Sequence, residues 1–265
     1  MSALTPGLCS VTFRALPPDA IIALAAECGL KGIEWGADVH VRPHDRAIAR
    51  AVAARCRDAG LAIVSYGSYV EAGSHITGQN FADVLEAAQA LGAPNIRIWA
   101  GRRGIPSAEA SLEDRNGAAH ALRGMAAKAA SLGISLSLEF HPQTLNDGAE
   151  ASRALLAAAR HPNLHTYWQP RPGITLEEAA AELDAIAPHL THLHVFCWSA
   201  SGERRPLAEG ADFWRPLLRR VSALAAPPGR PRYALLEFVA GDDPETLRRD
   251  AATLRNWLAE EAESE

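Results

Sequence analysis

Residues 134–140 read ISLSLEF and residues 232–238 read RYALLEF, two short apolar runs that each carry a glutamate near their end. Two further runs are similar: LHTYWQ (164–169) ends in Gln169, and HLHVF (192–196) contains His194. Each run is typical of a buried strand. Because the parallel strands of one barrel point the same way, the ends of four such strands can converge. These segments therefore predict a parallel barrel with a polar cluster at one end.

Candidate strands alternate with amphipathic, helix-like segments along the chain, and no stretch has the character of a linker. The strands are expected at residues 7–13, 32–35, 61–67, 95–100, 134–140, 164–169, 190–198 and 232–238. Most are continuous apolar runs, as parallel strands covered by helices should be. We predict an α/β protein, a (β/α)₈ TIM barrel in which residues 1–265 form a single domain. A doubly wound sheet is the alternative, but no GxGxxG follows the first strand.

Three of the expected loops are long and polar, at residues 68–78, 101–111 and 199–210. All three follow strands, whereas the connections from helices back to strands are short. In a barrel the loops after strands lie on the face where active sites form. We therefore expect a ligand site there.

Composition narrows the class of protein. The net charge is −5 and no basic run stands out, which disfavours a nucleic-acid partner. No segment is long and apolar enough to suggest a membrane span. The four cysteines show no CxxC spacing, so free thiols are expected. We expect a cytoplasmic protein with a small-molecule substrate and no membrane association, and a homo-oligomer is an open alternative.

Glu139 and Glu237 are the best candidates for chemistry, because a glutamate in an apolar strand is unfavourable to bury unless it is paired or binds a metal. The structural alternative is exposure at the strand end or pairing with an arginine such as Arg97. His194 lies on the same side of its strand as His192 but nearer the expected mouth, which favours it as a metal ligand. Imidazole with carboxylates suits Mn²⁺, Co²⁺ or Zn²⁺, while Mg²⁺ prefers more oxygen.

Four short motifs together resemble the xylose-isomerase-like barrel superfamily of sugar isomerases and epimerases. They are GIEW (32–35), LEFH (138–141), HLHV (192–195) and LLEF (235–238). The resemblance runs from the first strand to the last helix. It implies a TIM barrel and a carbohydrate-like substrate, without identifying one activity.

In the epimerase branch of that superfamily, one metal is held by Glu, Asp, His and Glu from strands 5 to 8. The resemblance assigns those positions to Glu139, Gln169, His194 and Glu237, so that Gln169 departs from the pattern. One formal charge near a divalent ion is worth on the order of several kcal/mol at an effective dielectric constant of about 20. A glutamine oxygen can still coordinate, so we expect a divalent metal ion (Mn²⁺, Co²⁺, Zn²⁺ or Mg²⁺) with weakened binding.

The family mechanism implies proton transfer through an enediolate between Glu139 and Glu237, standing on opposite faces of a sugar or small hydroxy-ketone. The metal would hold the carbonyl and hydroxyl oxygens of the substrate. This chemistry serves isomerisation and epimerisation alike. The side chains expected to touch the substrate are Glu34, His141, Arg205, Trp99 and Trp198.

Three other functions stay open. A non-catalytic sugar-binding barrel with a degenerate metal site is favoured by Gln169. A polyol dehydratase of the same superfamily would use the same proton abstraction followed by loss of hydroxide. A nuclease of the endonuclease IV type is disfavoured, because it needs more metal ligands and a basic groove.

Overall fold

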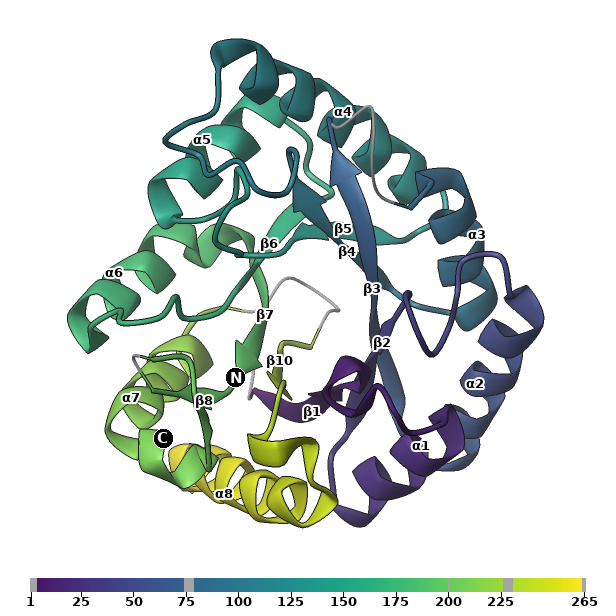
Figure 1. Ribbon diagram of the computed structural model, residues 1–265, viewed down its shortest axis with the longest axis vertical. Helices are drawn as coiled ribbons and strands as arrows, with labels where there is room; N and C mark the ends of the chain where they lie inside the picture. The colour runs from purple at the N-terminus through teal and green to yellow at the C-terminus, as the bar shows by residue number, and fades with distance from the viewer. Residues whose placement is uncertain (1–3, 74–78, 200, 226–230, 264–265) are drawn as a thin grey trace.

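The computed structural model describes residues 4–73, 79–199, 201–225 and 231–263. Eight parallel strands close into a barrel in the order β1-β10-β7-β6-β5-β4-β3-β2 (Figure 1). The barrel strands are β1 (Thr5–Cys9), β2 (Gly32–Gly36), β3 (Ala62–Ala72), β4 (Asn95–Ala100), β5 (Ser135–Leu138), β6 (Leu164–Trp168), β7 (Leu190–Val195) and β10 (Tyr233–Leu236). The predicted (β/α)₈ barrel is confirmed.

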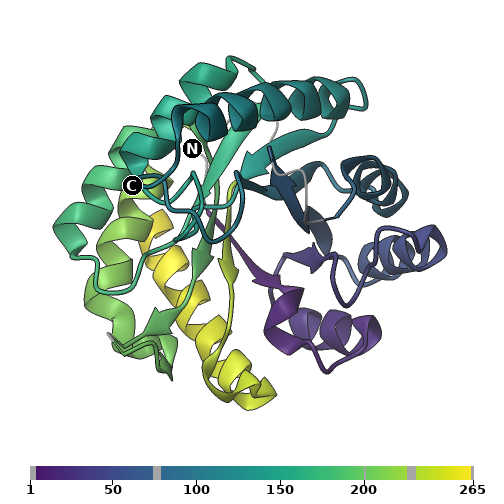
Figure 2. The ribbon, with the colours of Figure 1, turned by 45° about the horizontal axis from the view of Figure 1, so that its top comes forward.

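The α-helices form a layer outside the barrel, as Figure 2 shows. They are α1 (Pro18–Glu27), α2 (Arg46–Asp58), α3 (Phe81–Leu91), α4 (Leu112–Ala130), α5 (Ala149–Ala159), α6 (Leu176–Ile186), α7 (Ala211–Ser222) and α8 (Pro244–Glu263). Short 3₁₀ turns add η1 (Ser10–Phe13), η2 (Ala187–His189), η3 (Leu207–Gly210) and η4 (Ala240–Asp242). No helix in these described ranges is long and apolar enough to cross a membrane.

Local sequence explains where several helices begin. Ser111 accepts from the backbone N–H of Asp114 and Asp114 bonds back to Ser111, which forms a capping box at the start of α4. Thr175 and Glu178 form the same arrangement at α6. These caps satisfy N–H groups that have no partner inside the helix.

The space between helices and strands is apolar, whereas the inside of the barrel combines a small apolar cluster with polar side chains. Asn95 on β4 donates to Ser65 on β3 at 2.9 Å, and it accepts from Ser135 and Ser137 on β5 at 2.9 and 2.7 Å. Barrel interiors of this fold are usually filled by branched apolar side chains. Here a buried hydrogen-bonded layer lies inside the barrel toward the ends at which β4 and β5 begin, opposite the polar strand ends.

Three predicted strands show the largest differences from the observed bounds. The strand predicted at 7–13 ends at Cys9 and is followed by the 3₁₀ turn η1. The strand β3 continues to Ala72, so that residues 68–72 of the expected loop are strand, while residues 74–78 lie outside the described residues. The predicted strand 190–198 divides into β7 and β8 (Cys197–Trp198), and β8 pairs antiparallel with β9 (Arg204–Arg205).

Candidate active site

The polar side chains at the strand ends converge on one buried cluster. Glu139, Gln169 and Glu237 each follow the last residue of β5, β6 and β10, and His194 lies near the end of β7. Glu139, His194 and Glu237 each offer a ligand atom within 4.8 Å of those of the other two. The amide oxygen Oε1 of Gln169 lies 2.7 Å from His194 Nδ1. All four side chains are buried.

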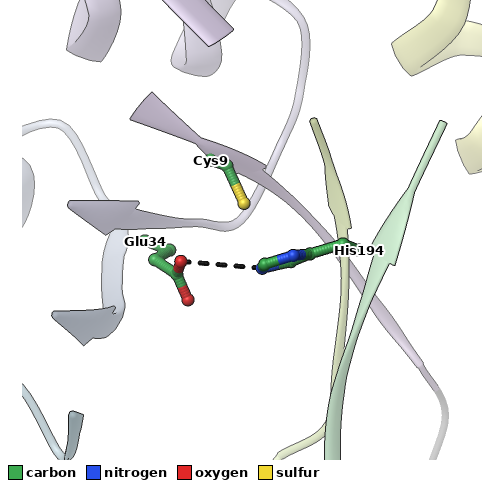
Figure 3. A group of neighbouring side chains, drawn as sticks. All are labelled: Cys9, Glu34 and His194. Atoms are coloured by element: carbon green, nitrogen blue, oxygen red, sulfur yellow. Dashed lines mark ion pairs between the residues drawn. The ribbon is translucent and has the colours of Figure 1, made fainter. Parts of the chain in front are cut away.

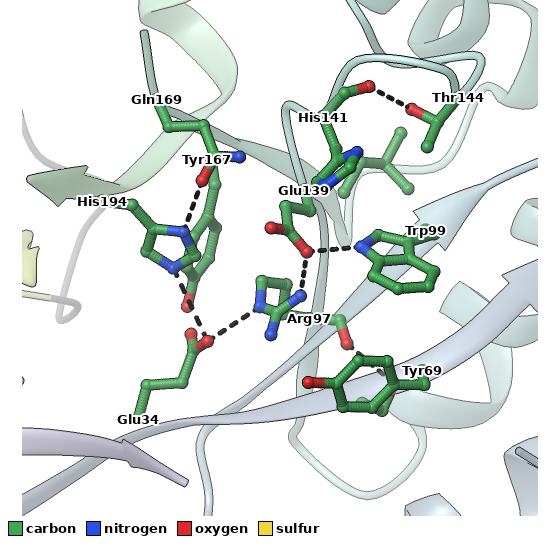
Figure 4. A network of polar contacts seen from close by, with 12 residues as sticks. Glu34, Tyr69, Arg97, Trp99, Glu139, His141, Thr144, Tyr167, Gln169 and His194 are labelled. Atoms are coloured by element: carbon green, nitrogen blue, oxygen red, sulfur yellow. Dashed lines mark hydrogen bonds and ion pairs between the residues drawn. The ribbon is translucent and has the colours of Figure 1, made fainter. Parts of the chain in front are cut away.

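Arg97 on β4 is the central cation of this cluster (Figure 4). Its Nε donates to Glu34 Oε1 at 2.8 Å, and its Nη1 donates to Glu139 Oε2. Trp99 Nε1 donates to the same Glu139 oxygen at 2.5 Å. Burial acts to raise the pKa of Glu139, but Arg97 and the neighbouring groups together outweigh it and hold that pKa below its usual value. The arginine pairing that the sequence offered as an alternative to metal binding is therefore present.

Gly67 on β3 makes room for this ion pair. A Cβ atom at Gly67 would lie 2.7 Å from Arg97 Nη2 and 2.8 Å from Glu34 Oε1, closer than such contacts occur. Gly67 pairs with Arg97 in the register of β3 and β4. A side chain here would therefore force the buried pair apart.

Glu34 lies beneath the cluster, next to His194 and Cys9 (Figure 3). Its Oε1 is 3.6 Å from His194 Nε2, and its side chain is 2% exposed. Metal-binding histidines commonly turn their second ring nitrogen toward a carboxylate, which fixes the orientation of the ring. Burial raises the pKa of the Cys9 thiol to about 12, so Cys9 packs here as a neutral group. Glu34 is thus placed to orient His194.

His194 stands between carboxylates on both sides. Nδ1 donates to Gln169 Oε1, since an amide oxygen only accepts, and it lies 3.3 Å from Glu237 Oε2. Burial acts to lower the pKa of His194, but its surroundings, the Glu237 carboxylate among them, raise it well above its usual value. The cluster holds three carboxylates around Arg97 and this imidazole, an excess of negative charge that a proton or a metal ion can neutralise.

The donor set fits a divalent cation. Both Arg97 and Trp99 use Glu139 Oε2, and within the described residues no hydrogen bond engages Oε1. Two carboxylates, one imidazole and one amide oxygen are a suitable set for Mn²⁺, Co²⁺ or Zn²⁺. Glu139, His194 and Glu237, with Gln169 beside them, are the residues that would hold the ion.

A cavity of about 270 Å³ opens above this cluster. It is lined by Val11, Arg14, Tyr69, Arg97, Trp99, Arg103, Glu139, His141, Pro142, Gln169, Pro170, Pro172, Phe196, Trp198, Glu237 and Phe238. Its volume is just below the range of about 300–1,000 Å³ typical of drug-sized ligands. The cavity therefore suits a small molecule in contact with the polar cluster.

The family model that describes a xylose isomerase-like TIM barrel matches residues 22–263. The chain belongs to the xylose isomerase-like TIM barrel family. A search of curated proteins finds no significant match.

Solved structures of the same fold have low sequence identity to this chain. A probable 3-DHS dehydratase, AsbF, from Bacillus anthracis superposes with a TM-score of 0.77 at 21% identity, covering 96% of this chain and 99% of the other. A xylose isomerase-like TIM barrel protein from Mycobacterium smegmatis in complex with magnesium gives 0.71 at 17% identity, covering 97% of each. A D-allulose 3-epimerase from Methylomonas sp. gives 0.69 at 16% identity, covering 97% and 99%. At these identities the likeness is one of fold.

Three of the five residues that the sequence associated with substrate binding line the cavity of this xylose isomerase-like barrel: His141, Trp99 and Trp198. Glu34 does not line it, because it is buried in its ion pair with Arg97. Arg205 is also outside it, on β9, where it pairs with Glu203 and Glu209 at the surface.

Several lining residues were not singled out from the sequence, namely Arg14, Tyr69, Arg103 and Phe238. Arg97 was considered only as a pairing partner. Its position inside the apolar run NIRIWA was the available signal, since an arginine in a buried strand needs a buried partner. The others follow from loop and strand geometry rather than from a motif.

Proposed function

We propose that the protein is a metal-dependent isomerase or epimerase that moves a proton on the carbon next to a carbonyl of a sugar or small hydroxy-ketone. The observation that carries this proposal is the group of Glu139, His194 and Glu237, whose ligand atoms lie within 4.8 Å of one another at the base of the cavity. When bound, a divalent cation would polarise the carbonyl oxygen and so acidify the neighbouring C–H bond.

Glu237 is the better candidate for the general base. Its Oε2 lies 3.3 Å from His194 Nδ1, and the described residues include no arginine or lysine paired with it. It also lines the cavity, where it can reach a bound substrate. A positioned carboxylate of this kind contributes about 10² to 10⁴ in rate.

Glu139 is better suited to holding the ion than to carrying a proton. Arg97 and Trp99 both donate to its Oε2, which favours the ionised form and weakens it as a base. We therefore assign proton abstraction to Glu237, and we assign to Glu139 the binding and positioning of the metal ion. Delivery of the proton by Glu237 to the neighbouring carbon, the former carbonyl carbon, would give isomerisation, whereas epimerisation requires a donor on the other face of the original carbon.

A dehydratase is the second candidate, and His141 is the observation that favours it. Its Nδ1 lies 2.6 Å from the carbonyl oxygen of Pro142, to which it can only donate, so that Nε2 carries the lone pair or a second proton. The ring lines the cavity beside Trp99, with centroids 5.6 Å apart. A proton supplied from this position would assist departure of a hydroxyl group as water. One neighbour in fold is described as a probable dehydratase.

Solvent deuterium incorporation tests the proposal directly. The purified protein is loaded with Mn²⁺, Co²⁺, Zn²⁺ or Mg²⁺, its metal content is measured, and it is incubated in D₂O with a panel of ketoses, aldoses and hydroxy-ketones. Mass spectrometry then follows deuterium in recovered and product sugars. An isomerase or epimerase places deuterium on one carbon, and a dehydratase yields a product lighter by one water.

The same experiment addresses the non-catalytic alternative. A protein that retains no metal after loading and exchanges no carbon-bound proton would contradict the proposal and favour a sugar-binding barrel. Exchange that survives complete removal of metal by a chelator would also contradict it.

A further inference from the structure

One wall of the cavity is a continuous row of cationic and aromatic side chains, which we name the basic-aromatic wall: Arg14, Tyr69, Trp99 and Arg103. Arg14 Nη2 donates to the Tyr69 hydroxyl at 2.8 Å. The rings of Tyr69 and Trp99 meet edge to face with centroids 5.1 Å apart. The guanidinium carbon of Arg103 lies 4.6 Å from the centroid of the Trp99 ring. The wall therefore joins the end of the 3₁₀ turn η1 to the loop after β4.

The three arginines that line the cavity differ in how their charge is compensated. Arg97 pairs with Glu34 and Glu139, and Arg14 pairs with Asp38. Arg103 forms no ion pair with any residue in the described part of the chain, although its backbone N–H donates to Glu71 at 3.3 Å. Its guanidinium is therefore the lining cation whose charge no described carboxylate neutralises.

The contact with Trp99 leaves Arg103 ready to bind an anion. A guanidinium stacked over an aromatic ring is held by its face, while the N–H groups at its edge stay available. Such an edge matches a carboxylate or phosphate, to which two parallel N–H groups can donate. Trp99 also bonds to Glu139, so the same indole connects this cation to the cluster at the base.

The lining away from the basic-aromatic wall has a different character. It includes the aromatic side chains Phe196, Trp198 and Phe238, along with prolines. These side chains suit the apolar face of a small carbon skeleton and offer no charge to an anion. A ligand with one anionic end would therefore direct that end toward Arg103.

We propose that the substrate of this site is a polyhydroxy carbonyl compound bearing a carboxylate or phosphate, and that Arg103 binds this anionic group. The inference rests on the proposed function, because it names the class of compound on which the same site acts. It adds that neutral sugars are the poorer ligands.

Equilibrium binding of three matched, unreactive probes tests the inference without requiring turnover. The probes are glucitol, gluconate and glucitol 6-phosphate, titrated calorimetrically into the metal-loaded protein at low ionic strength. We expect at least one anion to bind about 10- to 100-fold more tightly than glucitol, as charge-assisted hydrogen bonds allow. The gluconate and phosphate arms distinguish a carboxylate from a phosphate, and added salt should reduce the preference.

Arg103→Met provides the decisive variant and Arg102→Met its matched control. Arg102 is the preceding residue, is exposed, and does not line the cavity. The Arg103 variant should bind the preferred anion within about twofold of glucitol, whereas the Arg102 variant should keep the wild-type preference. Circular dichroism establishes that both variants are folded.

Three results would overturn the inference: equal binding of all three probes, no measurable binding of either anion, or an anion preference that survives in the Arg103 variant. Failure here is separable from failure of the proposed function. Deuterium exchange on neutral sugars without anion preference would sink only the inference. Anion preference without any exchange would sink only the proposed chemistry.

Discussion

Glu139 and Glu237 stand in the same sequence context, Leu-Glu-Phe, one residue beyond the ends of β5 and β10, yet their surroundings differ. Glu139 is bound by a buried arginine and a tryptophan, both through Oε2. Glu237 faces an imidazole at 3.3 Å and has no arginine or lysine partner within the described residues. The comparison teaches that the neighbouring strand, more than the motif, decides what such a glutamate can do.

The largest effects are expected when each glutamate is neutralised in turn, which tests whether Glu139 and Glu237 have different roles. Glu237→Gln should lower deuterium exchange at saturating metal by about 10² to 10⁴, because it removes the proposed base. Glu139→Gln should mainly lower the affinity for metal, because it removes a proposed metal ligand. It should affect the rate at saturating metal less, because Arg97 already makes Glu139 a weak base. Rates measured against metal concentration separate the two effects.

Glu209→Gln, an exposed glutamate outside the cavity, is the control for both and should leave exchange unchanged. If both cluster variants lose the same rate at saturating metal, the division of roles is wrong.

The second largest effect is expected on stability, from removing Arg97, the cation that pairs with Glu139 but not with Glu237. Arg97→Met leaves Glu34 and Glu139 buried without their partner, and breaking a buried ion pair in this way typically costs about 3–5 kcal/mol. Urea denaturation at neutral pH measures the loss. Arg102→Met, which removes an exposed arginine, should change stability very little. An Arg97 variant as stable as the wild type would show that the pair contributes nothing net.

The same variant should change how stability depends on pH. Burial acts to raise the pKa values of Glu34 and Glu139, but Arg97 leads the interactions that bring both below the ordinary 4.5. A lowered folded-state pKa stabilises the fold above the unfolded value, and this contribution is lost as pH falls toward the folded value. The wild type should therefore lose stability below about pH 4.5, and its advantage over Arg97→Met should shrink there. A constant difference down to pH 3 would contradict this.

A carboxylate at position 169 would test the metal site by adding a ligand charge instead of removing one. Gln169→Asp adds a negative charge beside His194 and Glu237, where the chain departs from the ligand pattern implied by its family resemblance. We expect metal affinity to rise about 10- to 100-fold, an order of magnitude consistent with one added charge in a partly screened site. Calorimetric titration with Mn²⁺ measures it, with Gln169→Asn as the uncharged control. An unchanged affinity would mean that residue 169 does not contact the ion.

The smallest predicted effect comes from a residue without a side chain. Gly67→Ala inserts a methyl group into the space of the Arg97–Glu34 pair, and overpacking of this kind costs about 1–3 kcal/mol. Gly124→Ala is the matched control: it lies on the exposed face of α4 with nothing within 4 Å of a new Cβ, so it should stabilise by about 0.5–1 kcal/mol. Thermal unfolding of both should give shifts of opposite sign. A harmless Gly67→Ala would mean that the ion pair relocates easily.

Alternation of strands and helices was sufficient to predict the barrel, and strand ends in a parallel barrel necessarily meet. That is why Glu139, His194 and Glu237 could be brought together from the sequence alone. Glu34 differs because it lies inside β2, two residues before the end of that strand, whereas Glu139 and Glu237 each lie one residue beyond the end of theirs. The side chain consequently lies below the cavity rather than on its surface.

The remaining differences have similar causes. Arg205 was expected near the substrate, but the chain after β7 folds back as the β8–β9 hairpin and directs it to surface partners. Arg103 reaches the cavity from a loop whose path no local pattern specifies. Sequence periodicity reports which face a residue occupies, whereas contacts between strands and loops depend on the register of the whole barrel.

The absence of a side chain at Gly67 also limits how this site could be moved elsewhere. A designer who grafted the four strand-end ligands onto another eight-stranded barrel would reproduce the visible cluster but would find the interior beneath it already filled. The guanidinium and its two carboxylates need an empty position on the third strand before they can assemble. Transferring the site to another barrel therefore requires a glycine at the position equivalent to Gly67 as well as the functional groups.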